Sequence, residues 1–143
     1  MIDQLSIDLS EYRIKKANDL LIQATILHNN GKYDGSVNRS YYAVFNSIRS
    51  ILALLKSDSP KHSGVLSLFD KAFVKTKIFD KRFSIIAHSA FENRQENDYE
   101  DFYIPTLEDS EIQLKNCEEF IREVERMREN LINGKIKLPE LDG

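Results

Sequence analysis

Large apolar residues recur every three or four positions along most of this chain, which is the spacing of a helix that buries one face. The spacing is clearest between residues 37 and 55. The apolar positions there are Val37, Tyr41, Val44, Phe45, Ile48, Leu52 and Leu55. No segment alternates apolar and polar residues in the way that predicts a half-buried strand. The pattern therefore predicts an all-α fold.

Five helical segments are expected, four of them long and one shorter. They cover residues 10–30, 34–56, 59–73, 80–98 and 106–134. Ser10 and Asp34 are suitable N-caps for the first two, because their side-chain oxygens accept hydrogen bonds from free N–H groups. Thr106 with Asp109 resembles a capping box. Short joints place successive helices alongside each other, so we expect an up-and-down antiparallel bundle.

Length and composition indicate one folded domain. The chain has 143 residues, of which 41% are hydrophobic, an ordinary content for a globular protein. We expect a single domain over residues 1–134 and a frayed tail at 135–143. No apolar run approaches the roughly 18 residues of a membrane helix, and the lone Cys117 fits a reducing cytoplasm. We therefore expect a cytoplasmic protein that makes no contact with a membrane.

Charge is unevenly distributed along the chain. The formal net charge is −3, which argues neither for nor against a nucleic-acid partner. Residues 70–82 carry five Lys and Arg side chains against two Asp, whereas residues 92–111 carry eight carboxylates against one Arg. The first segment could attract phosphates and the second could repel them. An ordinary solvated helix surface is the alternative interpretation of both segments.

A polar stripe runs beside the apolar face of the second helix. It consists of Arg39, Tyr42, Asn46 and Arg49, spaced three, four and three residues apart. These groups could bind a ligand, or they could satisfy one another where two helices meet. In the fourth helix, the stem of Arg94 should point into the bundle, and its planar guanidinium suits a carboxylate or a phosphate. If the two helices are adjacent, Arg94 would share a cleft with the stripe and reach Tyr42 or Asn46.

The sequence lacks the motifs of metal and cofactor sites. His28, His62 and His88 are isolated from one another and from Cys117, without the ligand spacing of a metal centre. Dinucleotide fingerprints and phosphate-cradling glycine loops are absent as well. We therefore expect no metal and no cofactor. His62 lies at a helix start, where it could make a local hydrogen bond or contact a nucleotide.

The segments NRSYYAVF at 38–45 and GKYDGSV at 31–37 resemble the second-helix signature of prokaryotic stand-alone HEPN domains (higher eukaryotes and prokaryotes nucleotide-binding). His62 and the segment ENRQENDYEDF at 92–102 follow in the same order, and the resemblance spans about residues 10–130. It implies an up-and-down helical bundle, often a homodimer, that acts on RNA or nucleotides. It also implies a small nucleotidyltransferase as partner in a toxin–antitoxin or defence pair.

The chain departs from this family at the site of catalysis. HEPN ribonucleases carry an arginine followed four to six residues later by a histidine, and this arginine corresponds to Arg94. The window for the histidine holds Tyr99, Glu100 and Asp101 instead. Histidine is the side chain that exchanges protons near neutral pH, so RNA cleavage by the usual route is not expected. Arg94, Asp98 and Tyr99 remain the catalytic candidates by resemblance.

The resemblance also implies a site of modification. In some HEPN toxins the nucleotidyltransferase adds nucleotides to a tyrosine just after the motif, which points to Tyr99 or Tyr103 as an AMP acceptor. The alternative is a tyrosine that packs at a helix end with its hydroxyl in water.

Our leading hypothesis is a dimeric HEPN module that binds RNA phosphates, nucleotides or a nucleotidyltransferase. The expected binding residues are Arg39, Tyr42, Asn46, Arg49, His62 and Arg94. Two alternatives stay open. One is a weak, metal-independent ribonuclease that uses Arg94 with a carboxylate or Tyr99. The other is a non-catalytic dimeric scaffold.

Overall fold

The computed structural model is all-α, as the sequence predicts. It describes residues 2–99, 101 and 103–141, and the side chains of residues 96–99 lie outside this description. The elements are α1 (Gln4–Asn29), α2 (Tyr33–Ala53), α3 (His62–Phe69), a π-helical turn (Asp70–Val74), α4 (Lys81–Tyr99) and α5 (Leu107–Ile132). No helix in this part of the chain is long and apolar enough to span a bilayer.

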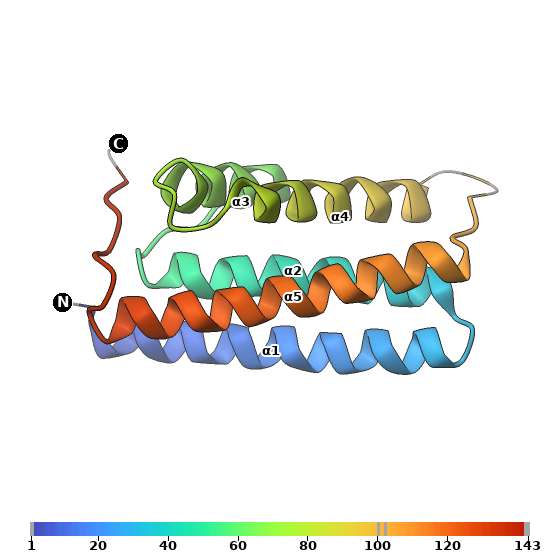
Figure 1. Ribbon diagram of the computed structural model, residues 1–143, viewed down its shortest axis with the longest axis horizontal. Helices are drawn as coiled ribbons and strands as arrows, with labels where there is room; N and C mark the ends of the chain where they lie inside the picture. Colours follow the sequence, from blue (N-terminus) through green and yellow to red (C-terminus); the bar gives the residue numbers. More distant parts are fainter. Residues whose placement is uncertain (1, 100, 102, 142–143) are drawn as a thin grey trace.

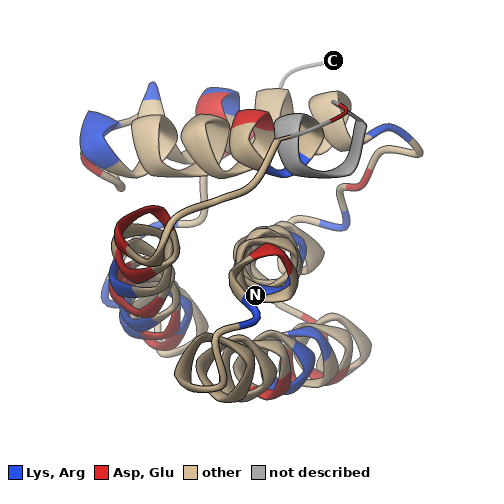
Figure 2. Ribbon diagram, turned by 90° about the vertical axis from the view of Figure 1, so that its right-hand side faces the viewer, with Lys and Arg blue, Asp and Glu red and all other residues tan. Residues whose placement is uncertain are grey.

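The helices form two layers (Figure 1). Helices α1, α2 and α5 run side by side, and α3 and α4 lie across them, as the end-on view in Figure 2 shows. Helix α1 runs opposite to α2, and α4 runs opposite to α5 (Figure 1). Because α2 contacts α1, α3, α4 and α5, it is the central helix, and 14 of its 21 residues are buried.

Side-chain caps fix the starts of α1 and α5. The predicted capping box of α5 is confirmed, with reciprocal hydrogen bonds between Thr106 and Asp109. The predicted start of the first helix is wrong, because Asp3 caps α1 and the helix begins at Gln4. Ser10 is instead buried within α1, where its hydroxyl lies 3.0 Å from that of Ser50. Asp34 lies inside the first turn of α2 and does not cap it.

Buried aromatic rings join the two layers. Phe69 from α3, Phe83 from α4 and Phe120 from α5 pack with ring centroids 5.6–5.9 Å apart, distances at which aromatic pairs attract. The C-terminal residues after α5 form no helix, but Ile136 and Leu138 rest against this core. The core therefore holds the α3–α4 layer in place over α2.

The connection between α2 and α3 is fixed by an ionic contact. Asp58 in this connection lies 2.7 Å from Arg49 of α2 and 3.4 Å from Arg13 of α1. Arg13 also donates to the backbone carbonyl of Arg49 at 3.1 Å. The hydrogen bond from Arg49 holds the pKa of the Asp58 carboxyl below its usual range. This contact positions the start of α3.

We expect Asp58→Asn to lower the free energy of unfolding at pH 7 by about 0.5–1 kcal/mol, the range for partly exposed ion pairs. Because the folded-state pKa of Asp58 is lowered, the stabilisation is present above the unfolded-state pKa of about 4 and is lost as pH falls through the folded-state value. Urea unfolding at pH 7 and pH 3 measures the difference. Glu123→Gln, which removes an exposed ion pair with Arg126 on α5, is the control. Equal stability of Asp58→Asn and the parent at pH 7 would contradict the assignment.

Candidate functional site

Three helices bring four polar or aromatic side chains together at the centre of the molecule. Helix α2 contributes Tyr41 and Tyr42, the first residue of α3 is His62, and α4 contributes Arg94. Successive helical residues point about 100° apart, so the two tyrosines face different neighbours. Tyr41 bonds to α3 and Tyr42 bonds to α4. We call these four residues the Arg–Tyr–His cluster.

Arg94 points into the bundle, which confirms the direction predicted from the sequence. Its Nη2 donates a hydrogen bond of 2.9 Å to the hydroxyl of Tyr42. Its Cζ lies 5.5 Å from the ring centroids of both Tyr41 and Tyr42, within the range of cation–π attraction. The guanidinium is therefore held between two aromatic rings.

Tyr41 connects this arginine to His62. The Tyr41 hydroxyl lies 2.8 Å from Nδ1 of His62. Tyr41 is 1% exposed, and burial raises the pKa of its phenol far above the usual value. The phenol therefore stays protonated, and a buried O–H group needs an acceptor. Donation to Nδ1 of His62 meets this need and leaves the imidazole proton on Nε2.

His62 is neutral at pH 7. Burial lowers its pKa, and the nearby charges of Arg94 and Arg49 lower it further. Its ring also packs against Phe45, with centroids 4.3 Å apart. The neutral ring with its proton on Nε2 is a hydrogen-bond donor on the side that Tyr41 does not hold.

An open pocket of about 540 Å³ lies beside the cluster. Its walls include Phe45, Arg49, Asp58 and His62. The guanidinium of Arg49 lies 5.9 Å from the Phe45 ring and 2.7 Å from Asp58. Asp58 is itself shared between Arg49 and Arg13, and Arg49 is the arginine that lines the pocket. The pocket and cluster together present donors from guanidinium, phenol and imidazole groups, which suits an acceptor-rich anion.

Other predicted binding residues lie elsewhere. Arg39 donates to Gln23 of α1 at 3.3 Å and to the neighbouring Asn38 at 2.9 Å, so it faces away from Arg94. Asn46 is buried and donates to the backbone carbonyl of Tyr42 at 2.8 Å. Of the three predicted arginines, Arg49 lines the pocket, Arg94 belongs to the cluster, and Arg39 belongs to neither.

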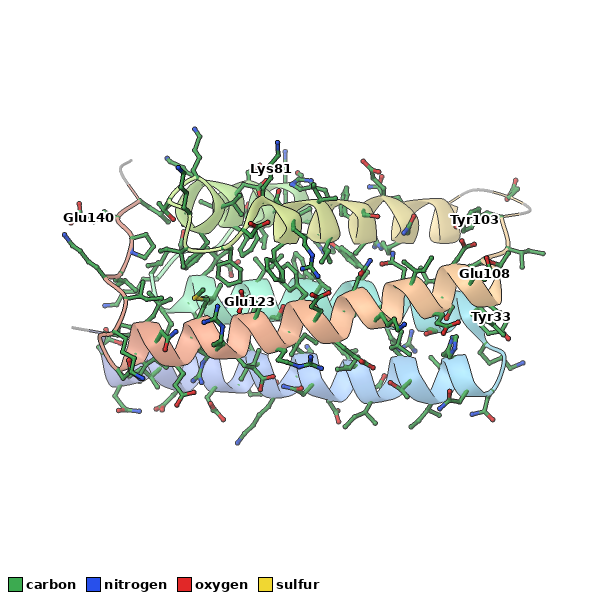
Figure 3. The ribbon with its side chains drawn as sticks, in the orientation of Figure 1. Tyr33, Lys81, Tyr103, Glu108, Glu123 and Glu140 are labelled. Carbon is green, nitrogen blue, oxygen red and sulfur yellow. The ribbon has the colours of Figure 1, made fainter. Side chains whose placement is uncertain are left out.

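Besides Arg94, which belongs to the cluster, the candidates for catalysis and modification are Asp98, Tyr99 and Tyr103. The side chains of Asp98 and Tyr99 are outside the described residues. Tyr103 is half-buried at the opposite end of α4 from Lys81 (Figure 3) and lines a small pocket of about 90 Å³ with Asn93.

Within the described part of the chain, no group of three or more His, Cys, Asp or Glu residues could hold a metal ion.

Sequence reasoning missed Tyr41 and Asp58. Tyr41 follows the apolar repeat of α2, which predicts a core residue, and nothing local distinguishes its buried hydroxyl. The spacing places the adjacent Tyr42 in the polar stripe. Asp58 precedes a Ser-Pro pair, a common turn start, and its arginine partners are nine or more residues distant.

We expect Arg94→Gln to raise the pKa of His62 toward the ordinary value of about 6.5, because the charge of Arg94 is one cause of its lowering. Proton NMR titration of the three histidines measures this shift. His28 and His88 serve as internal controls, since neither contacts Arg94. The matched variant Arg122→Gln removes an exposed arginine of α5 and should leave the titration of His62 unchanged. An unchanged His62 titration in Arg94→Gln would contradict the geometry.

Comparison with known proteins places the chain in a family. The HEPN domain profile matches residues 10–127. A "UPF0332 protein" of Thermotoga maritima is 31% identical over 121 residues, which cover 85% of this chain and 92% of that protein. A Methanocaldococcus jannaschii protein named "Putative toxin" is 30% identical over 126 residues, which cover 87% of this chain and 86% of that protein. Since the domain match extends over most of the sequence and includes every residue of the Arg–Tyr–His cluster, this chain belongs to the HEPN domain family.

Proposed function

We propose that this HEPN domain is the toxin-type member of a pair with a small nucleotidyltransferase, and that it binds the phosphate groups of RNA at the Arg–Tyr–His cluster and its pocket. Two similar proteins of Methanocaldococcus jannaschii carry the name "Putative toxin". The proposal includes a homodimer, as the family resemblance implies.

One observation carries the binding proposal: the cluster and pocket assemble donors from three helices. Arg94 is oriented by Tyr42, His62 by Tyr41, and Arg49 by Asp58. A phosphate accepts hydrogen bonds and carries negative charge, so it matches two guanidinium groups and an imidazole N–H. Phe45 beside the pocket adds an apolar surface for a base or ribose.

The same chemistry favours binding over cleavage. Attack of a ribose 2′-hydroxyl on phosphorus requires a group that accepts its proton. His62 presents a donor in the tautomer that Tyr41 selects, and the buried phenol of Tyr41 does not ionise near pH 7. The position of His62 beside Arg94 is nevertheless the one observation that favours a ribonuclease as the second candidate.

We expect Arg49→Gln and Arg94→Gln each to weaken binding of a structured RNA about tenfold, and to reduce the slope of log affinity against log salt by about one, as for a lost phosphate contact. Fluorescence anisotropy from low to moderate salt measures both quantities. Arg122→Gln on α5 makes the same charge change outside the pocket and should keep the parent slope. Circular dichroism melts exclude unfolding as the cause.

Unchanged affinity and slope in both pocket variants would overturn the binding proposal. The same samples test the ribonuclease alternative by gel analysis of the RNA with and without chelator. If the parent cleaves RNA and both His62→Gln and Arg94→Gln abolish this cleavage, the ribonuclease candidate would replace the binding proposal. Cleavage that survives both substitutions would come from a contaminant.

We expect co-expression with a nucleotidyltransferase from the adjacent reading frame to give a stable complex, and the mass of this chain to increase by one or more AMP groups. Intact-mass and peptide mass spectrometry locate the modified tyrosine. Tyr99→Phe and Tyr103→Phe distinguish the two candidates, and Tyr33→Phe, at the start of α2, is the control. A complex without any added mass would reject the modification, and absence of a complex would reject the partner.

A further inference from the structure

A larger cavity lies outside the Arg–Tyr–His cluster, where the π-helical turn meets the start of α4. Its volume is about 810 Å³. Four lysines line it: Lys71, Lys75, Lys77 and Lys81. We call it the lysine pocket. It coincides with the segment whose sequence carries the local excess of positive charge.

An unusual backbone conformation builds the lysine pocket. The turn Asp70–Val74 is π-helical and closes with a hydrogen bond of 2.8 Å from the amide of Lys75 to the carbonyl of Asp70. Lys77 then has a φ of 64°, a left-handed conformation that costs a residue other than glycine free energy. The chain turns back through a 2.7 Å hydrogen bond from the amide of Phe79 to the carbonyl of Phe73. π-helical turns and strained residues concentrate at functional sites.

Three lysines of this pocket are available to a ligand. Lys75, Lys77 and Lys81 are exposed, and within the described residues none of the three makes an ion pair. The neighbouring Arg82 differs, because it is engaged by Glu119 of α5. Lys81 lies on the outer side of the α3–α4 layer in Figure 3, away from α1 and α5.

Two carboxylates also line the lysine pocket, and each accepts a hydrogen bond through one oxygen, while Oδ1 of Asp70 is buried without a hydrogen-bond partner in the described part of the chain. Asp70 accepts a hydrogen bond at 2.8 Å from Nε2 of His88. Asp80 accepts one at 2.9 Å from the backbone amide of Arg82 at the start of α4. Val74 and Phe79 supply an apolar floor between the lysine side chains. A ligand with both anionic groups and a flat apolar face fits this lining better than a bare anion or an acidic peptide does.

We infer that the lysine pocket is a second phosphate-binding site, and that it takes a single-stranded RNA segment. Lys81 begins α4 and Arg94 lies thirteen residues further along the same helix, a separation of about 20 Å along the axis. The two side chains lie on different faces of α4, since Arg94 points toward α2 and Lys81 points outward (Figure 3), so a strand that contacts both sites must pass around the helix. The RNA identity of the ligand rests on the proposed function, whereas the existence of an anion site at the lysines does not.

The test is anisotropy of a labelled single-stranded RNA with the full chain. We expect the double variant Lys75→Gln/Lys77→Gln to weaken binding about tenfold and to reduce the salt slope by about 0.7 for each lysine, the value for phosphate contacts in single strands. Lys16→Gln/Lys115→Gln removes two exposed lysines from α1 and α5, and it should retain the parent affinity and slope.

An affinity and slope equal to the parent in Lys75→Gln/Lys77→Gln would overturn the site. If only Arg49→Gln and Arg94→Gln weaken binding, the lysine pocket fails and the proposed function stands. If only the lysine variant weakens binding, the second site stands and the cluster fails. Competition with AMP and with inorganic phosphate tests whether the site binds RNA, a free nucleotide or free phosphate. Displacement of the RNA by either small ligand at micromolar concentration would overturn RNA as the ligand.

Discussion

The burial of helix α2 is the constraint on which the rest of this structure depends. Neighbouring helices surround α2, so each polar group that it carries must find a partner inside the protein or pay the cost of losing water. Ser50 meets Ser10 of α1, and the hydroxyl of Ser36 donates to the carbonyl of Ala24 at 2.9 Å. The Tyr41 phenol meets His62 for the same reason. The site is thus a consequence of how a central helix satisfies its own polar groups.

Hydrogen bonding at this helix also determines the chemistry that is available. A phenol that cannot ionise selects one tautomer of the imidazole, and burial together with two nearby arginines lowers the pKa of that ring. Arg94 is held by two rings and a hydroxyl, which restricts its rotamers. Such preorganisation reduces the entropy cost of binding an anion. It is less suited to a proton-transfer role, which requires an accessible base.

Much of the fold follows from the sequence, because apolar spacing and caps are local signals. The fifth helix illustrates this, since Thr106 and Asp109 fix its first turn by contacts three residues apart. The start of α1 was misplaced because Ser10 has the side chain of a cap but bonds to Ser50, forty residues away. The inward direction of Arg94 followed from its distance to the core residues of its own helix.

The site itself could be predicted only in part. The spacing of Arg39, Tyr42, Asn46 and Arg49 identified a polar stripe on α2 but could not assign a neighbour to each member. Arg39 turns to α1 while Arg49 turns to the connection before α3. Partners of this kind depend on the packing of whole helices, and no local pattern encodes them. His62 likewise belongs to the cluster because helix packing brings it to Tyr41, a tyrosine 21 residues earlier in the sequence.

The π-helical turn after α3 has a consequence for how this chain tolerates insertions and deletions. A π-helical turn holds one more residue than an α-helical turn, as a single inserted amino acid would produce. Deleting one residue between 70 and 74 would restore the α-helical register. The residues between the deletion and the start of α4 would then rotate by about 100° about the helix axis. The buried Phe73 would then leave its place between Phe69 and Phe79. The length of this short segment is therefore as constrained as its composition.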